Sequence, residues 1–94
     1  MNGWTNKLMT LPPINSQPAE VDPLALVKFV DSESKWQWYG IEFDGMCCFG
    51  LVIGIEEEFG MFSLSELEEI NALAGYERIT LDETFVPTRI SELA

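Results

Sequence analysis

The pair Asp44-Gly45, set between two apolar segments, constrains the fold of this chain more than any other feature. An Asp-Gly pair favours a two-residue type I′ turn, because that turn needs positive φ at both central residues. Residues 36–43 before the pair are rich in aromatic side chains, and residues 46–55 after it are almost continuously apolar. The pattern predicts a β-hairpin. The expected cross-strand partners are Phe43 and Met46, Ile41 and Cys48, Tyr39 and Gly50, and Trp38 and Leu51.

Alternation along the two strands sorts the hairpin side chains onto two faces. Both faces are apolar, so we expect the hairpin to lie at the centre of a sheet that is covered on both sides. One face is expected to carry Trp36, Trp38, Phe49, Leu51 and Ile53. The other is expected to carry Tyr39, Ile41 and Phe43 above Cys48, Gly50 and Gly54, whose small size leaves room for aromatic rings.

The residues that follow contain a helix-start signal. Ser63 and Glu66 fit the two ends of a capping box, and Phe62 and Leu67 fit the hydrophobic staple around it. Apolar residues then recur at helical spacing, and Gly75 is suited to end the helix. This pattern predicts a helix between the staple and Gly75.

The remaining segments predict shorter elements around the hairpin. Pro12-Pro13 should end an N-terminal helix over residues 1–11, and a polar loop should fill residues 12–23. The other expectations are a strand over 24–30, a turn at 31–34, a break in the sheet at 56–58, a short strand at 60–62, a weak strand over 76–81 and a helical turn at 90–93. We therefore predict one α+β domain over residues 1–94: an antiparallel β-meander of three to five strands, a capped helix after the central hairpin and a short N-terminal helix.

Charge is the strongest global signal. Sixteen acidic residues against five basic ones give a net charge of −11, with no histidine. Such a charge opposes binding to nucleic acids and anionic membranes and favours basic partners. The alternative is that the acidic surface only keeps a chain with 47% hydrophobic residues in solution.

The sequence offers no catalytic constellation. Histidine is absent, and capping explains Ser63 and Ser65. Carboxylate pairs such as Glu42 with Asp44 are expected by chance among sixteen acids. The adjacent Cys47 and Cys48 should point to opposite faces of a strand as buried, reduced thiols. We therefore expect neither an enzyme nor a cofactor or metal. Without a signal peptide or a membrane-length apolar run, we expect a cytoplasmic protein.

Short strings spread over most of the chain match a known family pattern. They are Leu-Pro-Pro at 11–13, Val-Lys-Phe at 27–29, Trp-x-Trp-Tyr at 36–39, Glu-Phe-Asp-Gly at 42–45, Phe-Gly-Leu-Val at 49–52, Phe-Ser-Leu-Ser-Glu-Leu at 62–67, Glu-Arg at 77–78 and Pro-Thr at 87–88. On these strings the chain resembles the domain of unknown function 2958 family, small proteins carried on plasmids, phages and other mobile elements. The resemblance implies a mobile-element accessory protein, with no catalytic residues to carry over.

The charge and this resemblance together suggest an inhibitor of a bacterial host's defence machine, anti-CRISPR or anti-restriction. Its carboxylates would take the place of phosphates in a basic nucleic-acid groove. The expected contact residues are Glu56, Glu57, Glu58, Glu66, Glu69, Asp31 and Glu33. The alternative is a non-inhibitory adaptor or regulator of plasmid or phage functions, which would bind through an exposed aromatic patch.

Overall fold

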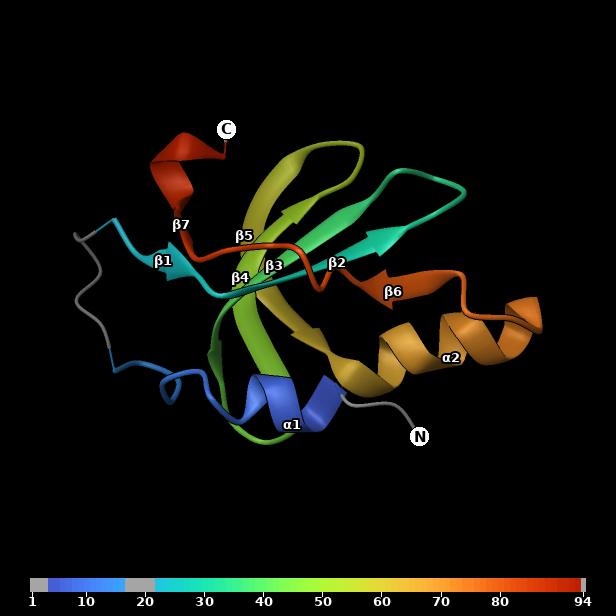
Figure 1. Cartoon of the computed structure of the whole chain (residues 1–94), viewed down its shortest axis with the longest axis horizontal. Helices are drawn as coiled ribbons and strands as arrows, with labels where there is room; N and C mark the ends of the chain where they lie inside the picture. The colour runs from blue at the N-terminus through green and yellow to red at the C-terminus, as the bar shows by residue number, and fades with distance from the viewer. Residues whose placement is uncertain (1–3, 17–21, 94) are drawn as a thin grey trace.

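The computed structural model of the chain describes residues 4–16 and 22–93. A five-stranded antiparallel sheet of order β5-β4-β3-β2-β6 forms its centre (Figure 1). The strands are β2 (Val27–Asp31), β3 (Gln37–Phe43), β4 (Cys47–Ile53), β5 (Glu57–Ser63) and β6 (Ile79–Leu81). Strands β2 to β5 follow one another as hairpins, whereas β6 returns to pair with β2 at the far edge. The predicted α+β class and meander are confirmed.

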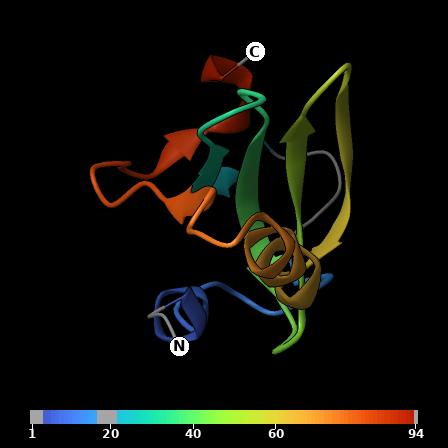
Figure 2. The same cartoon turned by 90° about the vertical axis from the view of Figure 1, so that its right-hand side faces the viewer.

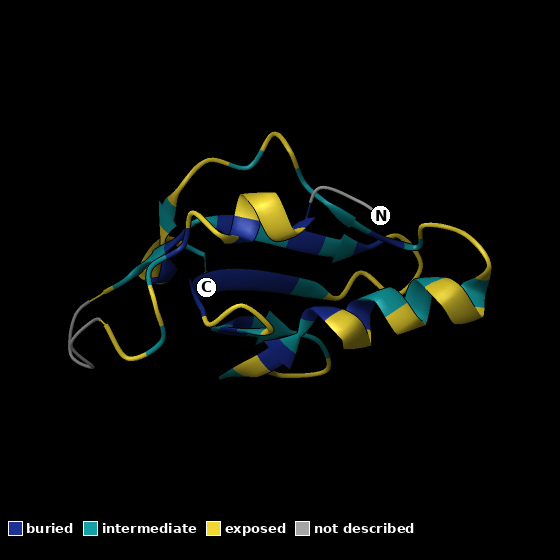
Figure 3. Ribbon diagram, turned by 90° about the horizontal axis from the view of Figure 1, so that it is seen from below, coloured by how far each residue is buried: buried dark blue, intermediate teal, exposed yellow. Residues whose placement is uncertain are grey.

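The other elements surround this sheet. The helices are α1 (Trp4–Leu8), α2 (Leu64–Ala74) and the single 3-10 turn η1 (Ile90–Glu92), while β1 (Leu24–Ala25) and β7 (Thr88–Arg89) form a separate two-stranded pair. Figure 3 shows that β3, at the centre of the sheet, is largely buried and that α2 exposes its outer side. The short N-terminal helix, the capped helix and the C-terminal helical turn are thus confirmed, although residues 1–3 and 17–21 of the expected helix and loop lie outside the described residues.

Two apolar clusters occupy the two faces of the sheet. The cluster under α1 and α2 contains Trp4, Leu8, Leu11, Val27, Phe29, Trp38, Phe43, Cys48, Phe62, Leu64, Leu67 and Ile79. The cluster under the C-terminal segment contains Ala25, Tyr39, Ile41, Leu51 and Ile90, with Phe49, Ile53, Phe85 and Leu93 packed against it. Both sides of the central hairpin are therefore covered, as its two apolar faces predict.

The predicted type I′ turn is wrong by one residue. The Asp44 N–H donates to the Cys47 carbonyl oxygen at 3.1 Å, which centres the turn on Gly45 and Met46. Gly45 has a φ of 101°, but Asp44 has no positive φ. Instead, one carboxylate oxygen of Asp44 accepts the N–H groups of Met46 and Cys47 at 2.8 and 2.7 Å. The aspartate therefore acts through its side chain, so Phe43 pairs with Cys48 and not with Met46.

A β-bulge in β3 changes the predicted faces. The register shifts between Gly40 and Glu42, which leaves Ile41 without a ladder partner. Before the bulge, Tyr39 pairs with Leu51, so Leu51 lies in the Tyr39 cluster and not beside Trp38 as expected. Beyond the bulge, Phe43 lies in the Trp38 cluster. Phe49 and Ile53 likewise pack with the Tyr39 cluster. An extra residue in one strand has this effect, because it moves the following side chains out of phase.

Two further strand predictions need correction. Glu57 and Glu58 do not break the sheet, because they pair with Ile53 and Val52 as the first residues of β5. The strand expected over residues 24–30 divides at Leu26 into β1 and β2. The predicted capping box is confirmed: the Ser63 hydroxyl accepts the Glu66 N–H at 3.1 Å, and the Glu66 carboxylate accepts the Ser63 N–H.

Three glycines in or next to β4 and β5 differ in what surrounds their Cβ positions. A side chain at Gly54 would lie 2.6 Å from the Trp36 ring, so the prediction of room for a ring is confirmed there. At Gly50 the obstacle is backbone, because a Cβ would overlap the Tyr39 carbonyl oxygen. Gly60, which faces Gly50 across the ladder, has no atom within 4 Å of its Cβ position and no positive φ.

These surroundings predict opposite effects for two alanine substitutions. Gly50→Ala should lower the free energy of unfolding by about 3 kcal/mol or more, because backbone must move to admit the methyl group. Gly60→Ala should leave it unchanged or raise it by about 0.4–1 kcal/mol, because alanine restricts the unfolded chain. Urea denaturation of both variants checks this. Equal losses in the two variants would contradict the packing described for Gly50.

Candidate functional site

Four of the predicted contact residues lie on one end of the sheet, which we call the acidic tip: Glu33, Glu56, Glu57 and Glu58. The β2–β3 turn carries Glu33 and the β4–β5 turn carries or adjoins the other three, and both views show these turns side by side (Figures 1 and 2). All four residues are exposed. The ring of Trp36 packs over Gly54 and so fixes one turn against the other. The fold therefore gathers carboxylates that the chain carries in two separate turns.

A shallow hollow of about 360 Å³ opens within the acidic tip. It is lined by the apolar side chains of Trp36, Val52 and Ile55 and by Glu56 and Glu58. Trp36 is 36% exposed, and its ring lies 6.1 Å from that of Trp38, centroid to centroid. An indole face beside two carboxylates suits an arginine or lysine side chain, whose stem packs on the ring while its cation meets the acids.

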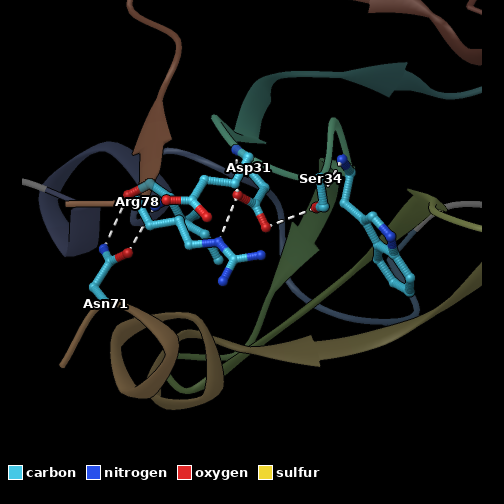
Figure 4. Close-up of polar contacts among 7 residues, drawn as sticks. Asp31, Ser34, Asn71 and Arg78 are labelled. Atoms are coloured by element: carbon cyan, nitrogen blue, oxygen red, sulfur yellow. Dashed lines mark hydrogen bonds and ion pairs between the residues drawn. The ribbon is translucent and has the colours of Figure 1, made fainter. Parts of the chain in front are cut away.

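Asp31, another predicted contact residue, is buried and bonded within the chain. Only 6% of it is exposed, and its carboxylate meets the Arg78 guanidinium at 2.9 Å (Figure 4). It also accepts the Glu33 N–H at 2.9 Å and the Ser34 hydroxyl at 2.7 Å. Burial works against ionisation, but these hydrogen bonds outweigh it and hold the pKa of Asp31 well below its ordinary value. Asp31 therefore shapes the acidic tip from inside and offers no carboxylate to a partner.

A second polar link steadies the same region from the helix side. The Asn71 side chain donates to the Ile79 carbonyl at 2.9 Å and accepts the Ile79 N–H at 2.7 Å, which ties α2 to β6 (Figure 4). The Arg78 carbonyl in turn accepts the Ser32 N–H at 3.0 Å. Arg78 and Asn71 thus connect α2, β6 and the β2–β3 turn, so the position of Glu33 depends on all three elements.

The structure does not bring Glu66 and Glu69 to the acidic tip. Both lie on α2, which begins at the end of β5 opposite to Glu57. The length of β5 separates Glu57 from the helix start by about 20 Å. The Glu66 carboxylate is moreover engaged with the Ser63 N–H in the capping box. These two exposed acids form part of the helix surface and do not add to the hollow.

Two features, one at the acidic tip and one at the opposite end of the sheet, were missed or misread from the sequence. Trp36 was expected in the core, and the only hint of its edge position is Gly54 across the hairpin end. Glu42 and Asp44, considered as an acid pair, serve different roles. Glu42 is buried and accepts the Asn15 N–H at 3.0 Å, whereas the exposed Asp44 holds the hairpin turn, whose N–H groups lower its pKa.

The cysteines are unpaired and differ in burial. Cys48 is fully buried, and burial raises the pKa of its thiol to about 12, whereas Cys47 is half-buried. Within residues 4–16 and 22–93, no three Cys, Asp or Glu side chains are grouped so that they could hold a metal ion. No helix in the described part of the chain combines the length and the apolar character needed to cross a bilayer.

The Asp31–Arg78 ion pair predicts a specific pH dependence. Because folding lowers the Asp31 pKa below 3.8, the carboxylate stabilises the fold above about pH 4 and loses this effect as the pH falls. Asp31→Asn should cost about 2–3 kcal/mol at neutral pH, since it leaves Arg78 unpaired. The difference between wild type and variant in urea denaturation should shrink below pH 4. Glu33→Gln, a neighbouring exposed control, should change stability by no more than about 0.5 kcal/mol.

Comparison with known proteins gives one match. Neither curated proteins nor solved structures yield a match to this chain. The pattern of one family, described as "Protein of unknown function (DUF2958)", matches residues 5–94. That span includes α2, both sheets, the acidic tip and all of α1 except Trp4, and so the chain belongs to the DUF2958 family.

Proposed function

We propose that this chain is a protein-binding inhibitor whose acidic tip occupies a basic, nucleic-acid-binding surface of a bacterial defence complex of the CRISPR or restriction type. The observation that carries the proposal is the hollow in the tip, which Trp36 lines together with Glu56 and Glu58. A surface that binds nucleic acid presents arginine and lysine side chains to phosphates. The tip offers such side chains carboxylates in place of phosphates and an aromatic ring beside them.

The overall charge supports the same partner class. A net charge of −11 attracts a basic surface and repels nucleic acid, so the chain would compete with nucleic acid for one site without binding it. The tip is also held in place before binding, by the Asp31–Arg78 pair below Glu33 and by Trp36 over Gly54. Such preorganisation reduces the ordering cost of association. The resemblance to proteins of mobile elements supplies the reason for opposing a host defence.

A second candidate is a non-inhibitory adaptor or regulator of mobile-element functions. Phe59 and Met61 of β5 favour it, because they are 55% and 51% exposed and lie beside the half-buried Phe49. An apolar contact of this kind responds weakly to salt, whereas a contact through the acidic tip weakens steeply as salt is added. Salt dependence of partner binding therefore separates the two candidates.

The inhibitor proposal predicts a loss of function in one triple variant. A host that carries a CRISPR or restriction system should plate phage more efficiently when it expresses the wild-type chain. The variant Glu56→Gln, Glu57→Gln, Glu58→Gln should lose this effect, because the tip loses its anionic groups. The matched control replaces the exposed Glu77, Glu83 and Glu92 with glutamine and should retain it.

Both triple variants carry three fewer negative charges than the wild type. A difference between them therefore reflects where the charges are removed and not the change in net charge. Equal loss in both would contradict a contact at the acidic tip. Absence of any wild-type effect across a panel of defence systems would contradict inhibition itself.

The hollow predicts binding of guanidinium side chains at Trp36. Trp36 is 36% exposed, whereas Trp4 and Trp38 are 6% and 7% exposed, so an oligoarginine peptide should change chiefly the Trp36 fluorescence. The affinity should fall sharply between about 0.1 M and about 1 M NaCl, as the Debye length falls from about 10 to about 3 Å. Trp36→Phe should abolish the fluorescence change, and an oligoglutamate peptide should cause none. A salt-insensitive signal would contradict the charge-based contact.

A further inference from the structure

Strand β5 forms an open edge of the sheet. Among the described residues it pairs with β4 on one side only (Figure 2). Its residues Glu57, Glu58, Phe59 and Met61 are exposed. The opposite edge, β6, has only three residues, whereas β5 has seven. Natural sheets usually shorten, bend or cover such an edge, because its unpaired N–H and C=O groups invite another strand. The ladder between β4 and β5 has neither a bulge nor a proline.

The hydrogen-bond pattern identifies the groups that point outward. Gly54 donates to the Glu56 carbonyl at 3.0 Å, and Leu64 donates to the Met46 carbonyl at 3.3 Å, one beyond each end of the ladder. In an antiparallel pair the bonded positions recur at every second residue. The backbone groups of Glu58, Gly60 and Phe62 therefore face β4. Those of Glu57, Phe59 and Met61 point away from it, along the open edge.

A second copy of the chain complements this edge. If two β5 strands pair antiparallel about Gly60, then Phe59 lies opposite Met61 of the second copy, and both positions contribute outward N–H and C=O groups. Their side chains lie on the same sheet face as their ladder partners Leu51 and Phe49. Each apolar row therefore continues from one copy into the other, across aromatic and methionine pairs of a favourable kind.

Gly60 fits the centre of this arrangement. Its Cβ position is open and its φ is not positive, so nothing within one chain requires glycine there. At the centre of the pair, the two copies of Gly60 would form a pair without mutual hydrogen bonds, in which strands bring side chains closest together. Glycine at this position allows the close approach of another backbone.

In this register the Glu57 carboxylates of the two copies are too far apart to repel each other strongly. Glu57 is three residues from Gly60, so the two copies of Glu57 lie about 20 Å apart, beyond the Debye length of about 8–10 Å at moderate salt. Glu57 instead lies opposite Ser63 of the second copy, the N-cap of α2, whose N–H already bonds the Glu66 carboxylate, so the two acids repel each other there until salt screens them. The remaining repulsion comes from the net charge of −11 on each copy and is screened by salt.

We propose that β5 is a self-association edge, through which two copies join their sheets antiparallel about Gly60. This inference does not rest on the proposed inhibition, since it uses the strand edge and not the acidic tip. A strand pair of this length buries less than the roughly 800 Å² per partner of a standard stable complex. The dimer should therefore form reversibly at high protein concentration. Added salt should strengthen it, in contrast to binding of a basic partner.

Sedimentation equilibrium of the full chain tests the proposal at about 0.1 M and about 1 M NaCl, over protein concentrations from about 10 µM to about 1 mM. We expect a monomer–dimer equilibrium whose dissociation constant falls as salt rises. Met61→Glu should raise that constant at least about tenfold, because it puts a carboxylate opposite Phe59. Leu73→Glu is the matched control: it adds the same charge at an 83% exposed apolar residue of α2 and should have little effect.

Amide hydrogen exchange of the wild type gives a readout that does not depend on any variant. With rising protein concentration, the N–H groups of Phe59 and Met61 should exchange more slowly, because they acquire partners. Those of Gly60 and Phe62, which already face β4, should change much less. A chain that stays monomeric at the highest concentration in about 1 M NaCl would overturn the proposal, as would a dimer that leaves the Phe59 and Met61 amides unprotected.

Discussion

The arrangement of the elements depends on the ion pair and hydrogen bonds that the buried Asp31 carboxylate makes. Asp31 ends β2, caps the following turn through Glu33 and Ser34, and reaches Arg78 at the entry to β6. An unpaired charge at this depth would cost several kcal/mol, so these contacts must form together. The β2–β3 turn, the outer strand and the end of α2 are thereby set relative to one another. The place of Glu33 beside the β4–β5 turn follows from that.

The two ends and two edges of the sheet have different characters. One end carries the acidic tip with its hollow, and the other carries the Asp44 turn and the start of α2. One edge is short, because β6 has three residues, while β5 offers seven. Charged contacts and backbone pairing would therefore use separate parts of the surface. Salt affects the two kinds of binding in opposite directions. It weakens the attraction between the acidic tip and a basic partner, and it reduces the repulsion between two copies that pair through β5.

Local signals predicted local structure well. The capping box at Ser63 and the stop at Gly75 act within one helical turn, so the sequence alone specified α2. The hairpin was also recognised, but not its register, because the Asp44 side chain bonded two N–H groups and moved the turn by one residue. The bulge at Ile41 depends on packing across the sheet, and no local sequence pattern predicts it.

The candidate site was only partly predictable for a similar reason. Sequence identifies acids but does not distinguish Glu56, which is exposed, from Asp31, which is buried beside an arginine 47 positions away. The hollow depends on Trp36 meeting Gly54 across a hairpin end, a contact between two turns. Glu66 and Glu69 were grouped with the tip by charge alone, and chain geometry places them at the other end of β5.

The bulge in β3 also bears on how the length of the chain can change in evolution. Ile41 is the extra residue between two pairs, Gly40 with Gly50 and Glu42 with Phe49. Its deletion would leave the ladder on both sides in phase, at the cost of one buried side chain. A deletion inside β3 or β4 away from the bulge at Ile41 and Glu42 would exchange the two faces of the strand beyond it. Relatives that are one residue shorter in this hairpin are therefore expected to lack a residue at this bulge.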